Sequence, residues 1–414
     1  MMTGKVEFRM AGADDAAGIS RVLEVFSPDP RTPQQVQEQV QHIQQTAQQW
    51  RIGVCGSEVV SAARAAPAEV WFGKSLIKWA DVGEVSVLSS LQGQGIGSLA
   101  MSDIVRRMRQ DDIGVSRLGG LLRFYRRFGY EPFPRCYVEF PLTDFIRAGV
   151  SRLPFADVLA PAFPETGQVR AFDAQRDLPR TWQVIESFTR HRTGCRAWQP
   201  PQDVPANMRH ALIYESAGQV RGVMRHREYE TDISSSEASV TIYGLFYDLS
   251  CPAALDALIK HTLKRAHQRK ATRVTAYLPM NEDVVAHLQR LGLTYTLCET
   301  MGAVAGNMIQ IINLRAMLEQ MQPELQRRLA DMSWSGNITL DLGDQQASLE
   351  IVAGQVGVRE AGGDTIKLRL SHAEWLRAVL GVLPSPWHRL LTPCDAAWSV
   401  LHALFSSSRG GYTT

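Results

Sequence analysis

The sequence lacks the features that mark a metal site, a disulfide scaffold or a membrane anchor. Its six cysteines stand singly along 414 residues, with no Cys-x-x-Cys pair and no Cys/His spacing of the kind that zinc sites use. We therefore expect no bound metal, and a reducing cytoplasm is the simplest location for such a chain. No apolar run approaches the roughly eighteen residues of a membrane span, and no charged, apolar and small-residue leader follows Met1, so we expect neither a membrane segment nor a secretion signal.

An excess of charge of one sign is also missing. The chain has 44 Lys and Arg against 42 Asp and Glu, a formal net charge of +2, so its composition favours neither a nucleic acid nor a membrane surface as a partner. Hydrophobic residues make up 45% and charged residues 21%, which is typical of a globular protein. Because 414 residues exceed what one ordinary core holds, we expect two or three domains.

A glycine-rich stretch between a predicted strand and a predicted helix indicates a binding site. Residues 84–88 alternate like a strand, residues 92–97 read Gln-Gly-Gln-Gly-Ile-Gly, and apolar residues from Ile96 to Met108 recur at helical spacing. Glycines let the backbone approach a ligand closely, and the free N–H groups that begin a helix attract an anion. This sequence pattern matches neither the dinucleotide-binding motif Gly-x-Gly-x-x-Gly nor the P-loop motif, which ends in Gly-Lys-Ser/Thr.

Residues 92–97 instead match the motif Gln-x-x-Gly-x-Gly. Farther along the chain, residues 124–130 read Phe-Tyr-Arg-Arg-Phe-Gly-Tyr. Together these two stretches resemble the motifs of the GNAT acetyltransferases. The resemblance implies acetyl-CoA as the co-substrate and Tyr125 as the acid that protonates the departing thiolate. The cofactor-binding residues that it implies are Val85, Ser86, Val87, Gln92, Gly93, Gln94, Gly95, Ile96, Gly97, Ser98, Gly120 and Leu121. Arg123, Arg126 and Arg127 are candidates for binding the 3′-phosphate of coenzyme A.

The order of predicted elements repeats along the chain. Residues 1–150 follow the GNAT order and end in a strand at 137–142, after which a proline-containing linker is expected. Residues 151–305 repeat this order without its chemistry. Residues 248–252 contain no glycine where the first copy has its loop, and Leu288 stands where the first copy has Tyr125. We therefore predict a degenerate second GNAT domain and one active site per chain.

Residues 306–414 have a different pattern. A predicted helix at 314–329 precedes several alternating strands, and a capping box of Ser371 with Glu374 begins another helix. This arrangement resembles a sterol-carrier-protein-2 fold, and the complete layout resembles that of the Eis-like acetyltransferases. The predicted class is α+β, with two GNAT-type domains of mixed sheet followed by the sterol-carrier-like domain. The resemblance also implies a homo-oligomer, since these relatives tend to form hexamers.

Three residues are candidates for the general base that takes the proton of the amine. In the Eis-like family the C-terminal carboxylate has this role, which here would fall to Thr414. The end of this sequence is rich in glycine and serine and lacks the Trp- and Asp-containing tail of those relatives, so it departs from the family's pattern. Other GNAT enzymes use a carboxylate on the cofactor strand, which makes Asp81 and Glu84 alternative bases.

The leading hypothesis is an acetyl-CoA-dependent N-acetyltransferase in which a primary amine attacks the thioester directly. By resemblance the acceptor is an aminoglycoside-like or polyamine-like molecule or a lysine side chain. Candidates for an acidic acceptor pocket are Glu24, Asp29, Asp81 and Glu84. Two other functions remain open, a lipid carrier that uses the third domain and a sensor that binds acetyl-CoA without turnover. Binding of acetyl-CoA would exclude the carrier, and release of the thiol would exclude the sensor.

Overall fold

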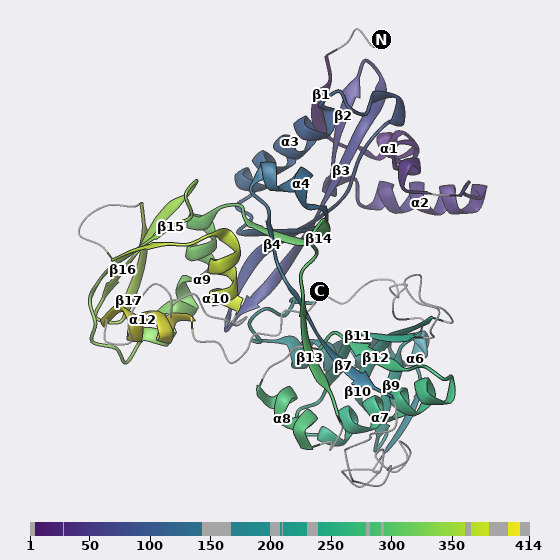
Figure 1. Ribbon diagram of the computed structural model, residues 1–414, viewed down its shortest axis with the longest axis vertical. Coiled ribbons are helices and arrows are strands. Elements are labelled where there is room, and N and C mark those ends of the chain that lie inside the picture. Colours follow the sequence, from purple (N-terminus) through teal and green to yellow (C-terminus); the bar gives the residue numbers. More distant parts are fainter. Residues whose placement is uncertain are drawn as a thin grey trace. The chain divides into compact units, whose positions relative to one another are not determined.

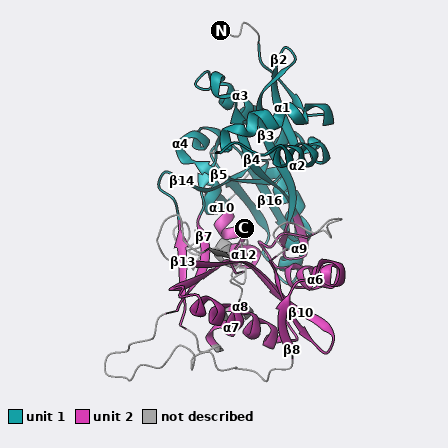
Figure 2. Cartoon of the chain, turned by 90° about the vertical axis from the view of Figure 1, so that its right-hand side faces the viewer, with its two compact units in different colours: residues 1–69, 77–133, 301–375 teal, residues 70–76, 134–300, 376–414 magenta. Residues whose placement is uncertain are grey.

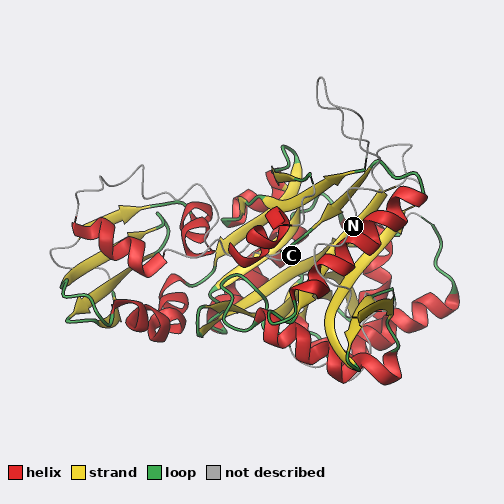
Figure 3. Ribbon diagram, turned by 90° about the horizontal axis from the view of Figure 1, so that it is seen from below, coloured by secondary structure: helices red, strands yellow, loops and turns green. Residues whose placement is uncertain are grey.

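The protein is a chain of mixed helices and sheets, as expected from the sequence (Figure 1). The structure is a computed structural model. It describes residues 5–27, 29–142, 167–198, 208, 210–229, 239–278, 282–290, 294–360, 366–380 and 396–405. The chain divides into two compact units, coloured separately in Figure 2. Unit 1 comprises residues 1–69, 77–133 and 301–375, and unit 2 comprises residues 70–76, 134–300 and 376–414. The predicted α+β class is confirmed, with two seven-stranded sheets and one four-stranded sheet among the described residues (Figure 3).

The first sheet contains the strands of the glycine-rich stretch. Its strands, in spatial order, are β1 (Glu7–Met10), β2 (Trp50–Cys55), β3 (Glu58–Phe72), β4 (Ser75–Val87), β5 (Val115–Leu121), β14 (Ala305–Ile311) and β6 (Glu131–Pro132). The strands β4 and β5 run parallel, whereas β1 with β2, β2 with β3, and β14 with both its neighbours run antiparallel. The adjacent strands β2 and β3 form a hairpin that turns at residues 56 and 57.

Helices cover both faces of the first sheet. The helices are α1 (Ala16–Val22), α2 (Pro33–Gln45), α3 (Ile96–Gln110) and α4 (Leu122–Tyr125). Buried residues of α1 and α2 share a cluster with Ala62, whereas Met101, Ile104 and Met108 of α3 share one with Ala63. Because neighbouring residues of a strand point to opposite faces, α3 lies on one side of the sheet and the α1–α2 pair on the other.

Two strands do not belong to the sheets that the order of the sequence suggests. The segment 137–142, expected as the last strand of the first copy, lies in β7 (Arg135–Pro141), which pairs with β12 and β13 of the second sheet. That part of the sequence-based interpretation is wrong. Its place in the first sheet is taken by β14, which lies between β5 and β6. Alternation of residues along a strand identifies the buried face but carries no information about which sheet the strand joins.

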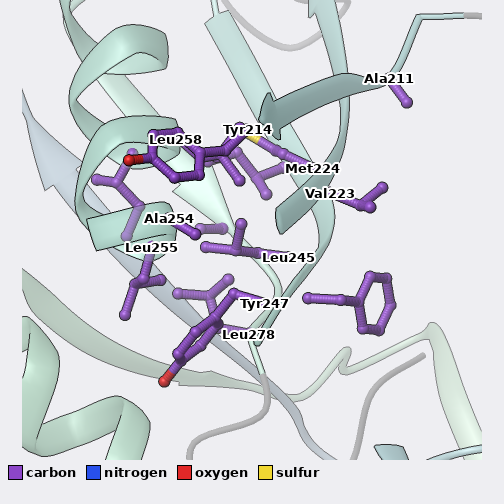
Figure 4. Close-up of a cluster of buried hydrophobic side chains, with 14 of the residues drawn as sticks. Ala211, Tyr214, Val223, Met224, Leu245, Tyr247, Ala254, Leu255, Leu258 and Leu278 are labelled. Carbon is purple, nitrogen blue, oxygen red and sulfur yellow. The ribbon is translucent and has the colours of Figure 1, made fainter. Parts of the chain in front are cut away.

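The second sheet has the spatial order β13-β7-β12-β11-β10-β9-β8. Its other strands are β8 (Gly167–Ala171), β9 (Leu212–Ser216), β10 (Gln219–Tyr229), β11 (Ser239–Tyr247), β12 (Arg273–Ala276) and β13 (Thr296–Thr300). The helices α6 (Ala174–Thr189), α7 (Pro252–Gln268) and α8 (Glu282–Arg290) accompany it. Ala254, Leu255 and Leu258 of α7 pack with Tyr214 and Met224 in the core of this sheet (Figure 4).

The third sheet follows β14 in the sequence and has the order β17-β16-β15-β18. Its strands are β15 (Gly336–Asp341), β16 (Gln346–Val352), β17 (Gln355–Arg359) and β18 (Ile366–Arg369), and its helix α9 (Leu314–Leu329) has the predicted bounds. The helix α10 (His372–Leu380) begins with the predicted capping box of Ser371 and Glu374. The last described helix is α12 (Ala396–Phe405). Among the described helices, none is both long and apolar enough to cross a membrane.

The position of β14 predicts that proline in this strand destabilises the first sheet. Ile309 is fully buried and pairs with Arg117 of β5 on one side and with Glu131 of β6 on the other. Its backbone N–H therefore faces a neighbouring strand on either side. We expect Ile309→Pro to lower the free energy of unfolding by on the order of 3 kcal/mol or more, measured by urea denaturation. The control Ile309→Val keeps the N–H and should cost only about 1 kcal/mol. Equal stability of the two variants would contradict the pairing.

Candidate active site

The site begins where two parallel strands separate. Strands β4 and β5 pair from Trp79 with Val115 to Val82 with Leu118, and there the ladder ends. Beyond this point β5 keeps its partner on the other side, because residues 119–121 pair with residues 305–307 of β14. The backbone of β4 from residue 83 to residue 87 therefore has no β5 partner. Its N–H and C=O groups can bond to an extended ligand inserted between the two strands.

A glycine loop joins the end of β4 to the start of α3. Gly93 and Gly95 have φ values of 78° and 83°, a left-handed conformation that L side chains rarely adopt. A Cβ atom at either position would meet nothing within 4 Å, so the backbone is open to a ligand. Gly95 is also the N-cap residue and has no side chain to occupy the free N–H groups of the first turn of α3. This is the arrangement that binds phosphate at a helix N-terminus.

Tyr125 closes the other side of the opening. It ends α4, and its ring packs on Gly120, where an added Cβ would lie 2.4 Å from Cε2 of the tyrosine. The ring of Phe124 meets it edge to face at a centroid distance of 4.9 Å. Burial raises the pKa of the Tyr125 phenol above its ordinary value of 10.0. Its hydroxyl makes no hydrogen bond to any residue in the described part of the chain, so it is available to a ligand.

These elements enclose a cavity of about 680 Å³, a volume typical of small-molecule sites. It is lined by Val25, Phe26, Gly83, Glu84, Val85, Ser86, Val87, Leu91, Gln92, Gly93, Gly95, Ile96, Gly97, Ser98, Gly119, Gly120, Leu121, Phe124, Tyr125 and Arg127. Eleven of the twelve cofactor-binding residues expected from the sequence are in this set, together with Tyr125. The twelfth, Gln94, is exposed and does not line the cavity.

The three candidate bases have different surroundings. Glu84 lines the cavity with its side chain 41% exposed, and its nearest cationic contact is Arg64, at 3.6 Å. Asp81 does not line the cavity, and its carboxylate accepts hydrogen bonds from Arg117 at 3.0 Å and from the Trp79 indole at 3.1 Å. Thr414 lies outside the described residues.

Glu84 also has an unusual backbone conformation. Its φ is 55°, in the left-handed region that a residue with a side chain enters at a cost of about 1 kcal/mol or more. The neighbouring Gly83 supplies flexibility immediately before it. Such strain is concentrated at functional sites, where it sets the direction of a side chain. Here it occurs on β4 just past the last pair with β5.

Sequence reasoning missed part of the cavity wall. Helical spacing in the sequence predicts that Phe26 shares one apolar face with Ile19, Val22 and Leu23. Those three are buried, but Phe26 is 56% exposed and lines the cavity. The α-helix ends at Val22 and residues 23–26 form a tighter 3-10 helix, so the α-helical spacing that aligns Phe26 with Ile19 and Val22 no longer applies there.

Of the three arginines near Tyr125, only Arg127 lines the cavity. Its guanidinium stacks over the ring of Phe124 at 5.0 Å and donates a hydrogen bond of 3.3 Å to the Ser98 hydroxyl in the first turn of α3. It therefore adds a positive charge beside the open N–H groups of that helix. A fixed cation and a helix N-terminus together favour a bound phosphate.

The corresponding loop of the second sheet has a different geometry. No described residue from 248 to 252 has a positive φ, and the Asp248 carboxylate accepts a bond from the N–H of Ser250 at 2.9 Å. A Cβ on Gly222 would come within 3.0 Å of Ala254 and Leu258, so the start of α7 packs closely on β10 (Figure 4). Leu288, which stands in place of Tyr125, is 1% exposed in the core.

The glycine loop provides a test of the cofactor site. Gly95→Ala adds a methyl group on the ligand side of a left-handed residue, so we expect acetyl-CoA to bind at least about tenfold more weakly by isothermal titration calorimetry. Gly56→Ala is the matched control, since Gly56 also has a positive φ of 61° and open space but lies in the β2–β3 turn away from the cavity. Equal affinities of the two variants would contradict the assignment of the loop.

Known structures similar to this chain extend over its whole length. A GCN5-related N-acetyltransferase from Kribbella flavida aligns with a TM-score of 0.64 and 18% identity, covering 99% of this chain and 97% of that one. Another from Anabaena variabilis aligns with a TM-score of 0.66 and 13% identity, covering 98% of each chain. Eis1 from Mycobacterium abscessus aligns with a TM-score of 0.59 and 16% identity, covering 97% of each. At these identities the comparison establishes the fold.

The match to a protein family concerns the first sheet and the cavity. The family model of the acetyltransferase (GNAT) domain matches residues 7–133, which include the glycine loop and Tyr125. No curated protein matches the chain in sequence. The family match and the geometry of the cavity lead to the same conclusion: residues 7–133 form a GNAT acetyltransferase domain, and the protein is an acyltransferase.

Proposed function

We propose that the protein is an acetyl-CoA-dependent N-acetyltransferase whose acceptor is a primary amine that attacks the thioester directly. The observation that carries this proposal is that one cavity is lined by the unpaired part of β4, the open N-terminus of α3 and the Tyr125 phenol. A lipid carrier or a plain scaffold has no use for these three features together. A sensor would need the first two but not the phenol.

The residues of the cavity divide into a binding part and a reacting part. The backbone of residues 85–87 would hold the pantetheine arm, and the N–H groups of residues 93–98 would hold the pyrophosphate, with Arg127 contributing a positive charge. Both glycines of the loop leave space for this approach. The described residues contain no group of three or more His, Cys, Asp or Glu that could bind a metal ion.

The reaction needs one proton acceptor and one proton donor. The nitrogen of the neutral amine forms a bond to the acetyl carbon, and the carbon–sulfur bond breaks. The base removes the extra proton from nitrogen, and the departing thiolate takes a proton from Tyr125. Because burial raises the pKa of the phenol above 10.0, Tyr125 keeps its proton throughout the neutral range and can donate it.

Glu84 is the base that the geometry favours. It lines the cavity, whereas Asp81 does not and its carboxylate is engaged by Arg117. The 3.6 Å contact to Arg64 exceeds hydrogen-bond distance, so one carboxylate oxygen of Glu84 remains available to the amine or to a bridging water. The C-terminal carboxylate of Thr414 remains the competing proposal.

The layout of the whole chain forms part of the proposal. We infer an N-terminal GNAT domain within residues 1–150, a degenerate GNAT-like domain within 151–305 and a sterol-carrier-like domain within 306–414, with β7 and β14 exchanged between the first two sheets. The resemblance to the Eis-like acetyltransferases further suggests a homo-oligomer, with six chains as the expected number. Analytical ultracentrifugation would measure that number.

Tyr125→Phe should lower the turnover number well over tenfold while the dissociation constant of acetyl-CoA stays the same, because only the proton donor is lost. Because burial raises the pKa of the Tyr125 phenol above 10.0, the fall in the wild-type turnover number due to loss of this proton should come at a more alkaline pH than for an ordinary phenol. Steady-state thiol release between pH 6 and pH 11 measures both effects. Tyr243→Phe in the second sheet is the control and should keep full turnover. Full turnover of the Tyr125 variant would remove this residue from the mechanism.

Two further variants distinguish the bases. If Glu84 is the base, Glu84→Gln should lower the turnover number by about a hundredfold, and a chain lacking residues 411–414 should keep its activity. The opposite result would assign the role to the terminal carboxylate. The loss in Glu84→Gln should diminish as the pH rises toward the pKa of the amine, because more of the substrate is then already neutral. A pH-independent loss would instead indicate a role in binding.

A further inference from the structure

The wall of the cavity includes large apolar side chains that remain in contact with solvent. Phe26 is 56% exposed, Val25 is 42% exposed and Leu121 is 59% exposed, and all three line the cavity. Residues of this kind are usually buried in a folded chain. When several of them gather at a cavity, they are typical of a surface that binds an apolar group.

This apolar wall extends to the reacting end of the cavity. Leu121 directly follows Gly120, on which the Tyr125 ring packs, and Leu121 and Tyr125 both line the cavity. Val304 is close by, because its carbonyl accepts a hydrogen bond of 2.9 Å from the N–H of Leu122, and it is 73% exposed. The pyrophosphate end of the cavity, in contrast, is formed by the glycine loop and Arg127.

The cavity has little negative charge. Glu84 is the only acidic residue among the described residues that line it. The other three acidic candidates, Glu24, Asp29 and Asp81, do not line the cavity. Two of them also form ion pairs, Glu24 with Arg31 at 3.1 Å and Asp81 with Arg117 at 3.0 Å. A polycation would leave most of its charges without a partner here, and desolvating an unpaired charge is costly.

We propose that the acceptor is a monoamine attached to an apolar group, with its nitrogen at Glu84 and its aromatic or alkyl part against Phe26 and Leu121. This inference rests on the proposed function and specifies the acceptor of that reaction. It excludes aminoglycosides and polyamines as preferred substrates. The single carboxylate matches the single amine, and the exposed apolar side chains match the apolar part.

The test compares amines that differ in one property at a time. Thiol release by the full-length enzyme is measured with 2-phenylethylamine, n-hexylamine, n-butylamine, ethanolamine, spermidine and kanamycin at saturating acetyl-CoA. We expect kcat/KM for 2-phenylethylamine to exceed the values for ethanolamine, spermidine and kanamycin more than tenfold. From butylamine to hexylamine it should rise roughly threefold per added methylene.

A pair of variants tests whether Phe26 contributes to binding of the apolar part of the acceptor. Phe26→Ser should lower kcat/KM for 2-phenylethylamine about tenfold or more, mostly through KM, and should reduce its advantage over ethanolamine. Leu99→Ser is the matched control, because Leu99 is 55% exposed on α3 but does not line the cavity, and it should match the wild type. Calorimetric titration with acetyl-CoA verifies in each variant that the fold and the cofactor site are intact.

The outcomes separate this inference from the function on which it rests. If acetyl-CoA binds but no amine releases thiol, the proposed function itself fails. If thiol is released but spermidine or kanamycin equals or exceeds 2-phenylethylamine, the function stands and the apolar acceptor is overturned. If Phe26→Ser keeps the wild-type selectivity but changes an oligomer into monomers in the ultracentrifuge, the apolar wall is an interface between copies, which also overturns the inference.

Discussion

The separation of β4 from β5 is the constraint on which the cavity depends. A strand that leaves its neighbour exposes unpaired backbone groups, and a folded chain tolerates this only where water or a ligand satisfies them. The strand β5 can part from β4 because β14 provides hydrogen bonds along its other edge from Val115 to Leu121. Gly120 is in that paired segment and supports the ring of Tyr125. A strand outside residues 1–150 therefore holds the proposed proton donor in place.

The open start of α3 is supported by the buried part of the same helix. Met101, Ile104 and Met108 are almost fully buried against the sheet. Asp103, only 3% exposed, binds the guanidinium of Arg51 from β2 at 2.6 Å. These contacts fix the direction of the helix, and with it the direction of the N–H groups of its first turn. In the second sheet α7 is also tightly packed, but the loop before it has no left-handed glycine. A fixed helix alone is therefore not a phosphate site, since the backbone before it must also be accessible.

The sequence was sufficient for features that depend on local geometry. The glycine loop between a strand and a helix, the capping box of Ser371 and Glu374 and the bounds of α9 all follow from residues close together in the chain. It was insufficient for features that depend on distant partners, such as the exchange of β7 and β14 between sheets. It also missed Phe26 as a cavity residue, because helical spacing indicates which side chains share a face but not where the helix stops. Asp81 and Glu84 lie three residues apart in one strand, and only the end of the β4–β5 ladder makes their surroundings differ.

The origin of β14 has a consequence for biosynthesis. When the ribosome has released residues 1–133, every sequence motif of the first GNAT domain has emerged, yet β5 still lacks one neighbour until residues 305–311 are made. Until then the nascent chain exposes the edge of β5, which other unfinished chains could pair with. Contacts across such a long stretch also form slowly. We therefore expect the ability to bind the co-substrate to appear late in translation, after the second sheet has been synthesised.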